Sequence, residues 1–167
     1  MSAPELSVIA PCYNEELNVA PLVARVLATF DAMEIDAELV LVDDGSRDKT
    51  WSQIEEAAAR HPRVRGFQHV VNKGIVGGWQ TGLSGSRGRL VCLIDSDLQN
   101  RPEDIPRLYE AFLHHEPDLV QAVRHPKVNK NRIAFSKGLN VLLNAAFGMH
   151  LRDNKSGFIL CPREVLA

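Results

Sequence analysis

The sequence predicts an α/β protein with an open, mainly parallel sheet that helices cover on both faces. Short apolar runs alternate with segments of helical periodicity along the chain. Most of these runs are continuously apolar, which is typical of strands buried on both faces. The alternation of strand and helix favours parallel strands joined by right-handed crossovers.

Six segments are predicted as strands because each is short and several are rich in Val, Ile and Leu. Such a run differs from a helix by its length and by the turn residues that follow it. The predicted strands are residues 6–10, 38–42, 64–69, 89–94, 119–123 and 158–161.

The segments between the strands are predicted as helices, because apolar residues recur there every three or four positions. Pro102 opens one of them and is followed by two acidic residues, which suits the exposed N–H groups of a first helical turn. The last predicted helix covers residues 133–147 and is strongly apolar. The other apolar positions are Leu17, Leu22, Val26 and Phe30; Trp51, Ile54 and Ala58; and Ile105, Leu108, Ala111 and Phe112.

The composition indicates one ordinary globular domain. The chain has 167 residues, of which 45% are hydrophobic and 24% are charged, and its net charge of −2 does not indicate bulk attraction to nucleic acid or to an anionic membrane. Three widely spaced cysteines form neither a disulfide framework nor a zinc spacing, which fits a reducing compartment. The start lacks the pattern of a signal peptide, and no apolar run is long enough for a membrane span. We expect a single domain over residues 1–167, truncated at its C-terminus, where "CPREVLA" reads as an unfinished helix start.

Polar residues follow several predicted strands at the point where each strand ends. The ends read "PCYNEE", "VDDGS" and "DSDLQ". In open α/β sheets, ligands bind outside the carboxyl ends of the strands. Each acidic end alone is also explained by a turn or a helix cap. Several acidic ends at one edge would need a cation or bound donors, so this edge is the predicted site.

Asp95 and Asp97 follow a buried strand and are separated by one residue. In an extended segment both carboxylates, and Gln99 two residues further on, would face the same side. An all-oxygen set of this kind suits Mg²⁺ or Mn²⁺, with substrate phosphate oxygens completing the shell. The alternative is a solvated turn in which Asp97 caps the helix that begins at Pro102.

Three common motifs are missing. No Gly-x-Gly-x-x-Gly follows the first strand, and "NKGIVGGWQTG" lacks the Gly-Lys-Ser/Thr ending of a P-loop. No Gly-x-Ser-x-Gly elbow indicates a hydrolase. These absences argue against dinucleotide-binding, P-loop and serine-hydrolase classes.

Five motifs in the order "LSVIAPCYNEE", "LVLVDDGSRDKT", "NKGIVGGWQTGL", "CLIDSDLQNRPEDIPRL" and "RDNKSGF" resemble glycosyltransferase family 2. The resemblance runs from Leu6 to the last residue and is greatest to the polyprenyl-phosphate sugar transferases, the dolichol-phosphate mannosyltransferase-like group. It implies the GT-A fold, a Rossmann-like mainly parallel sheet. Two positions depart from the family pattern, since Ile159 follows Phe158 where arginine is common, and Cys12 stands where Thr or Ser is usual.

The resemblance also implies roles for individual residues. Asp44 matches an aspartate that contacts the nucleoside, and Asp153 matches an acidic residue near the acceptor. Arg124, Arg132 and Ser136 match positions around the phosphates, and these three with Asp153 form the predicted catalytic set. The predicted nucleotide-sugar site comprises Pro11, Tyr13, Asn14, Glu15, Val42, Asp43, Asp44, Lys73, Asp95 and Ser96, and the predicted metal ligands are Asp95, Asp97 and Gln99.

The predicted function is inverting, metal-assisted transfer of a sugar from a GDP- or UDP-linked donor to a polyprenyl or dolichyl phosphate. A phosphate acceptor is anionic and needs arginines rather than a base, whereas a hydroxyl acceptor would need Asp153 as base. Lys127, Lys130 and Arg132 precede the apolar helix, where a lipid phosphate would dock. We therefore expect a cytoplasmic protein at the cytoplasmic face of a membrane, with no nucleic-acid partner.

Other functions stay open. A family 2 enzyme could instead act on a saccharide or protein hydroxyl. A nucleotidyltransferase shares the sheet and the acid-bound metal, although the acidic "PCYNEE" loop argues against it. A non-catalytic nucleotide-sugar-binding domain is the third alternative.

Aromatic and histidine residues are expected to be mostly structural. Trp51 and Trp79 lie on helical faces, where core packing is favoured over stacking on a sugar. His69 and His150 could reach a ligand, but no pattern in the sequence supports that. His61, His114, His115 and His125 are expected at the surface.

Overall fold

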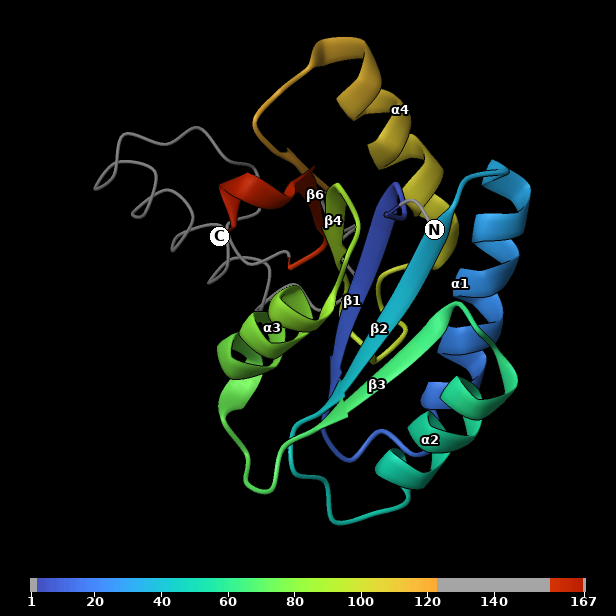
Figure 1. The fold of residues 1–167 in the computed structure, drawn as a ribbon, viewed down its shortest axis with the longest axis vertical. Coiled ribbons are helices and arrows are strands. Elements are labelled where there is room, and N and C mark those ends of the chain that lie inside the picture. The colour runs from blue at the N-terminus through green and yellow to red at the C-terminus, as the bar shows by residue number, and fades with distance from the viewer. Residues whose placement is uncertain (1–2, 123–156, 167) are drawn as a thin grey trace, which may run out of the picture.

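The computed structural model describes residues 3–122 and 157–166 of the chain. Within these residues, six strands form one sheet in the order β3-β2-β1-β4-β6-β5 (Figure 1). The strands are β1 (Leu6–Cys12), β2 (Ala37–Asp43), β3 (Val64–Gln68), β4 (Leu90–Leu93), β5 (Val120–Gln121) and β6 (Ile159–Pro162). The helices are α1 (Val19–Met33), α2 (Thr50–Arg60), α3 (Gly74–Gly85) and α4 (Ile105–His115), with short 3-10 helices η1 (Pro102–Asp104) and η2 (Arg163–Val165).

The sheet is mainly parallel, as the sequence predicts. β1 lies parallel to both β2 and β4, and β2 lies parallel to β3. β6 runs antiparallel to its two neighbours, β4 and β5, so the sheet is mixed. The reversal of β6 was not predicted, because an apolar run carries no information about its direction.

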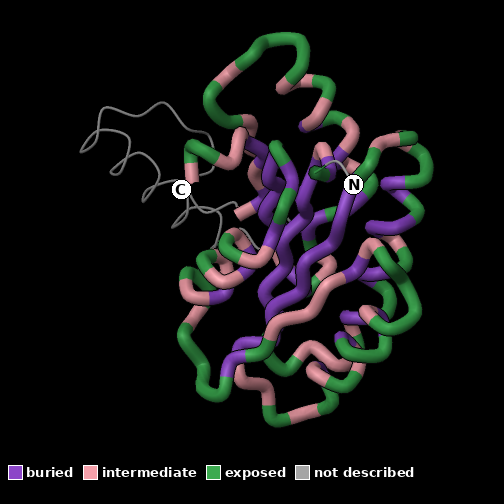
Figure 2. Tube along the Cα trace, in the orientation of Figure 1, coloured by how far each residue is buried: buried purple, intermediate pink, exposed green. Residues whose placement is uncertain are grey.

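Helices cover both faces of the sheet, which confirms the predicted layers. α1, α2 and α4 lie on one face and α3 lies on the other (Figure 1). Successive residues of a strand point to opposite faces, so Val8 and Ile9 belong to different core clusters. The inner strands are buried along most of their length (Figure 2).

The predicted element boundaries are close to the observed ones. β1 continues two residues past its predicted end, and β5 is shorter than predicted. Leu17 was predicted as the first apolar position of a helix, but it precedes α1 and is 82% exposed. The predicted helix at residues 133–147 lies outside the described residues. All three cysteines are buried and free.

The glycines of α3 have a packing role. A Cβ on Gly78 would lie 2.7 Å from Cβ of Pro11, and a Cβ on Gly82 would overlap the side chain of Ile9. α3 can therefore approach β1 more closely than a helix with larger residues at these positions. This packing accounts for a glycine-rich segment that has no P-loop ending.

Candidate active site

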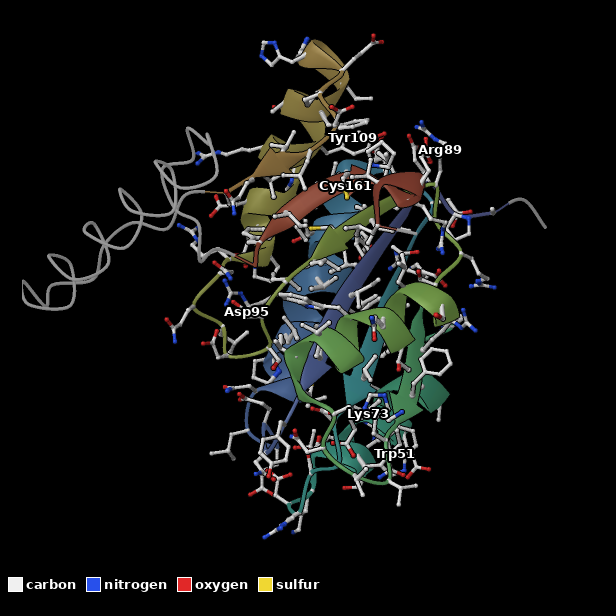
Figure 3. The ribbon with its side chains drawn as sticks, turned by 90° about the vertical axis from the view of Figure 1, so that its left-hand side faces the viewer. Trp51, Lys73, Arg89, Asp95, Tyr109 and Cys161 are labelled. Carbon is white, nitrogen blue, oxygen red and sulfur yellow. The ribbon has the colours of Figure 1, made fainter. Side chains whose placement is uncertain are left out.

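Four loops meet at the carboxyl edge of the parallel strands. They follow β1, β2, β3 and β4, and they carry the nucleotide-sugar and metal residues that the sequence predicts. Pro11 and Val42 are buried in the strands that lead into the first two loops. Figure 3 shows Asp95 beyond the end of β4, with Arg89 at the opposite end of that strand. The topology therefore brings these predicted residues to one edge.

The loops after β1 and β2 are joined by reciprocal hydrogen bonds. The backbone N–H of Asn14 donates to Oγ of Ser46 at 2.9 Å, and the N–H of Arg47 donates to Oδ1 of Asn14 at 2.9 Å. The N–H of Glu15 donates to Oγ1 of Thr50 at 2.8 Å. Asn14 has a φ of 55°, which asparagine tolerates better than most residues. These bonds hold the two loops as one unit.

Tyr13 lies beside this loop pair and is 45% exposed. An exposed aromatic ring on a bonded, well-defined loop can stack on a flat ligand group. The position is compatible with the predicted contact to a base or ribose.

Asp43 and Asp44 differ in their surroundings although both are buried. Oδ1 of Asp43 accepts from the N–H of Ser46 at 3.2 Å, and Oδ2 accepts from Nε2 of Gln68 at 3.1 Å. The first of these bonds is the turn geometry that the sequence left open as an alternative. Asp43 thus ties the end of β2 to its own loop and to β3.

Asp44 is bonded to the loop after β3. Its Oδ1 accepts from the N–H of Lys73 at 2.8 Å and lies 2.7 Å from Nδ1 of His69. Nε2 of His69 lies 2.7 Å from Oγ1 of Thr81 in α3. Lys73 therefore reaches Asp44 through its backbone, while its side chain is exposed (Figure 3).

The sequence named His69 as able to reach a ligand but did not predict its contact with Asp44. His69 is 5% exposed and connects Asp44 to α3. The sequence shows a histidine after a strand and a threonine twelve residues later, and no local pattern relates them. Their contact depends on the packing of α3 against the sheet.

The segment after β4 turns instead of continuing in the predicted extended form. Ser96 and Asp97 form a turn, and Leu98 has a φ of 59° in the left-handed region. The expectation that Asp95, Asp97 and Gln99 lie along an extended segment is therefore wrong. Local hydrogen bonds of Asp97 favour the turn over the strand.

Asp97 and Gln99 bond to each other within this turn. Oδ1 of Asp97 accepts from the backbone N–H of Gln99 at 3.0 Å, and Oδ2 accepts from Nε2 of Gln99 at 2.6 Å. The solvated turn of the alternative interpretation is confirmed, but the cap is wrong, because Arg101 occupies the N-cap of η1, with no side-chain cap hydrogen bond. Both Asp97 and Gln99 are exposed, and Asp95 accepts from Nδ2 of Asn100 at 3.1 Å.

The residues 3–122 and 157–166 contain no group of three or more His, Cys, Asp or Glu side chains arranged to hold a metal ion. The metal assignment to Asp95, Asp97 and Gln99 therefore stays a prediction. Their oxygen atoms are the ligand type that Mg²⁺ and Mn²⁺ prefer. Ser96, which was assigned to the donor, is buried at the turn.

Some predicted residues lie outside the described part of the chain. They include the basic positions Lys127 and Lys130, and the whole predicted catalytic set. The predicted catalytic residues not described are Arg124, Arg132, Ser136 and Asp153.

Among the described helices, none is both long and apolar enough to cross a membrane.

Two relatives resemble most of this chain. Undecaprenyl-phosphate 4-deoxy-4-formamido-L-arabinose transferase of Aeromonas hydrophila subsp. hydrophila is 36% identical over 150 residues, covering 89% of this chain and 46% of the relative. Dolichol-phosphate mannosyltransferase of Pyrococcus furiosus is 31% identical over 170 residues, covering 97% of this chain and 47% of the relative. The chain thus spans about half the length of the curated relatives it matches.

The fold also matches solved structures of glucosyl-3-phosphoglycerate synthase from Mycobacterium tuberculosis. The complex with UDP gives a TM-score of 0.73 at 25% identity, covering 96% of this chain and 57% of that one. The complex with Mn²⁺, UDP and glucosyl-3-phosphoglycerate gives a TM-score of 0.73 at 22% identity, with the same coverage of both chains. The Glycosyl transferase family 2 model matches residues 7–166. Together with the relatives, this match shows that the chain belongs to glycosyltransferase family 2.

Proposed function

We propose that this chain is the donor-binding part of a glycosyltransferase that transfers a sugar to a polyprenyl phosphate. The observation that carries the proposal is the similarity to the two polyprenyl-phosphate transferases over most of the chain. Their names give different sugars but the same class of acceptor, a polyprenyl phosphate. The acceptor class is therefore the better supported half of the proposal, and the sugar is left open.

The four loops at the carboxyl edge would hold a nucleotide-diphosphate sugar, linked to UDP or GDP. Tyr13 and Asp44 would contact the nucleoside, because they lie in the loops after β1 and β2. Asp95 and Asp97 would hold the diphosphate through Mg²⁺ or Mn²⁺. The exposed carboxylate of Asp97 fits this role, since it is reachable and its oxygens suit a hard cation. When bound, the cation would neutralise charge that develops on the leaving diphosphate.

Basic and acidic residues of the chain would have different roles toward the acceptor. A lipid phosphate is already a nucleophile at neutral pH, so it needs to be positioned rather than deprotonated. Arg124, Arg132 and Ser136 are the proposed positioning groups for the phosphates. Attack from the face opposite the leaving diphosphate would invert the anomeric carbon. Asp153 would act as a base only with a hydroxyl acceptor.

A polyprenyl phosphate resides in a membrane, so this enzyme would work at a membrane surface. We propose the cytoplasmic face, because nucleotide sugars are the donors and the three free cysteines fit a reducing compartment. No partner beyond the donor and the lipid phosphate is proposed.

The test is a transfer assay with radiolabelled UDP-glucose and GDP-mannose, offered to the full-length protein with Mn²⁺. Polyprenyl phosphate and free saccharides are supplied as acceptors in separate reactions. Label in the lipid phase, lost in the Asp97→Asn variant, is the expected result. Label in saccharide alone would overturn the acceptor class. Nucleotide-sugar binding without transfer to any acceptor would favour a non-catalytic domain.

A further inference from the structure

His69 is a buried polar side chain that has no role in the proposed function. It follows β3, and its backbone N–H donates to the carbonyl oxygen of Asp43 at 2.8 Å. Its ring lies between Asp44 and Thr81, with one ring nitrogen 2.7 Å from each side chain. The side chain of His69 is 4% exposed, so little of it is open to a ligand. Because both ring nitrogens have partners, the ring is held in one orientation.

The ring nitrogen beside Asp44 acts as a hydrogen-bond donor. A carboxylate only accepts, so Nδ1 of His69 carries the proton and Oδ1 of Asp44 accepts it. The backbone N–H of Lys73 donates to the same oxygen at 2.8 Å. Two donors from the segment after β3 therefore hold Oδ1, and they fix the direction in which the carboxylate is turned.

The second oxygen of Asp44 is left for a ligand. Within residues 3–122 and 157–166, the side-chain hydrogen bonds of this carboxylate all go to Oδ1, although the side chain is only 5% exposed. In the same residues, Nε1 of Trp79 is the one enclosed side-chain nitrogen or oxygen without a partner. Oδ2 of Asp44 is thus not enclosed, and a ligand can reach it. A largely buried carboxylate with one unpaired oxygen favours a ligand that donates to it.

One available oxygen suits a base that presents one donor. Uracil presents a single N3–H between two carbonyl groups, and a second carboxylate oxygen turned toward it would meet a carbonyl. Guanine presents an N–H beside an NH₂, and this pair is best matched by both oxygens of a carboxylate. Cytosine presents an unprotonated N3, which a carboxylate oxygen repels. Because His69 and Lys73 already occupy Oδ1, Asp44 is best matched to uracil.

We propose that His69 is a positioning residue, which holds Asp44 so that Oδ2 accepts the N3–H of a uracil base. This inference rests on the proposed function and narrows its donor to a UDP-linked sugar. A ribose hydroxyl also offers a single donor to this oxygen. CDP has the ribose and diphosphate of UDP but lacks the N3–H, so a comparison of UDP with CDP separates the two sources.

The test measures the dissociation constants of UDP, CDP and GDP for the full-length protein by calorimetric titration with Mn²⁺. The unmodified protein binds UDP about tenfold more tightly than CDP, and also more tightly than GDP. His69→Phe keeps a ring but removes the donor, so UDP binding weakens about tenfold while CDP binding changes less than about twofold. His69→Asn carries an amide N–H close to the position of Nδ1 and restores most of the preference for UDP.

Gln68→Met is the matched control. Gln68 precedes His69 in the chain and donates to the neighbouring carboxylate, that of Asp43, at 3.1 Å. Its replacement leaves the preference for UDP over CDP unchanged. Urea unfolding shows whether each variant is folded. If His69→Phe does not fold, Thr81→Val is the second variant, because it removes the partner of Nε2 and lowers the preference for UDP about threefold.

The three nucleotides also separate failure of this inference from failure of the proposed function. Equal weakening of UDP and CDP binding in His69→Phe would reduce His69 to a packing role. Equal binding of UDP and CDP by the unmodified protein, or tighter binding of GDP, would refute the uracil assignment. All these outcomes leave the proposed function standing. Failure of the unmodified protein to bind any of the three nucleotides would refute the proposed function, and this inference with it.

Discussion

Two carboxylates at opposite edges of the sheet, those of Glu38 and Asp97, differ in exposure and in their hydrogen-bond partners. At the amino edge, Glu38 is 1% exposed and accepts from Oγ of Ser7 at 2.8 Å and from Nη2 of Arg87 at 2.8 Å. At the carboxyl edge, Asp97 is exposed, and its hydrogen bonds to Gln99 come from two residues away in its own turn. One carboxylate ties distant segments together, and the other stays accessible to solvent.

This difference separates a carboxylate that stabilises the fold from one that is available for the proposed binding role. Burial alone would raise the pKa of Glu38, but hydrogen bonds from Ser7 and Arg87 outweigh it and lower that pKa below its usual range. Its stabilising effect is therefore present above the pKa of an unfolded glutamate and is lost as the pH falls through the folded value. Within the described residues, the hydrogen bonds of Asp97 join it to Gln99 alone, so we expect it to change partners at little cost to the fold.

The largest expected change in unfolding free energy is at the amino edge. Glu38→Ala removes the carboxylate that accepts hydrogen bonds from the Ser7 hydroxyl and the Arg87 N–H. Both donors then lack this acceptor, and we expect the unfolding free energy to fall by about 3 kcal/mol. Urea unfolding measures this loss. Glu38→Gln keeps an oxygen acceptor and serves as the milder control. A loss below about 1 kcal/mol would mean that the two edges do not differ in stability.

At the carboxyl edge, Asp97→Asn is expected to change binding and not stability. Mn²⁺-dependent affinity for UDP or GDP falls about thirtyfold, which corresponds to about 2 kcal/mol, while unfolding free energy stays within about 0.5 kcal/mol. Calorimetric titration with and without Mn²⁺ measures the first quantity, and urea unfolding measures the second. Unchanged metal-dependent affinity would refute the metal assignment, and a large stability loss would make Asp97 a structural residue.

Asp44 lies between these extremes, because it is buried at the carboxyl edge, where donor binding is proposed. Asp44→Ala removes the acceptor of Lys73 and His69, so unfolding free energy falls by about 1–2 kcal/mol. Affinity for UDP or GDP falls about tenfold, by a similar factor with and without Mn²⁺. Asp44→Asn keeps one oxygen acceptor and is the control. An effect seen only with Mn²⁺ would place Asp44 in the cation site instead.

The smallest effect on unfolding free energy is expected at an exposed ion pair between α1 and η1. A hydrogen bond from Arg25 lowers the pKa of Glu103 to about 2, with the two side chains 2.6 Å apart. Both side chains are substantially exposed, so solvent screening limits the pair to less than about 1 kcal/mol. Glu103→Gln therefore loses this small stability at neutral pH. The difference shrinks as the pH falls from about 4.3 toward 2, because the wild-type carboxylate is then protonated. Thermal unfolding at several pH values checks this, and an equal difference at pH 2 and pH 7 would contradict it.

The sequence by itself determined the strands and the layers, and it predicted the edge of the sheet at which a site would lie. Continuous apolar runs such as that of β1 mark buried strands, and the polar residues after them predict the binding edge. These features follow from local patterns, because burial and turn formation act on neighbouring residues. Five motifs in order were also enough to identify the family, which the comparisons confirm.

Tertiary structure alone decided the direction of β6 and the partners of buried polar groups. His69 meets Asp44 and Thr81 because α3 packs closely on the sheet, and Trp79 meets Gly157 from a distant part of the chain. Each of these contacts depends on which surfaces are pressed together, and no local pattern encodes that. Hydrogen-bonding groups pair with the partners that packing brings within reach. The hydrogen bonds between distant residues therefore depend on the packed structure and not on local sequence.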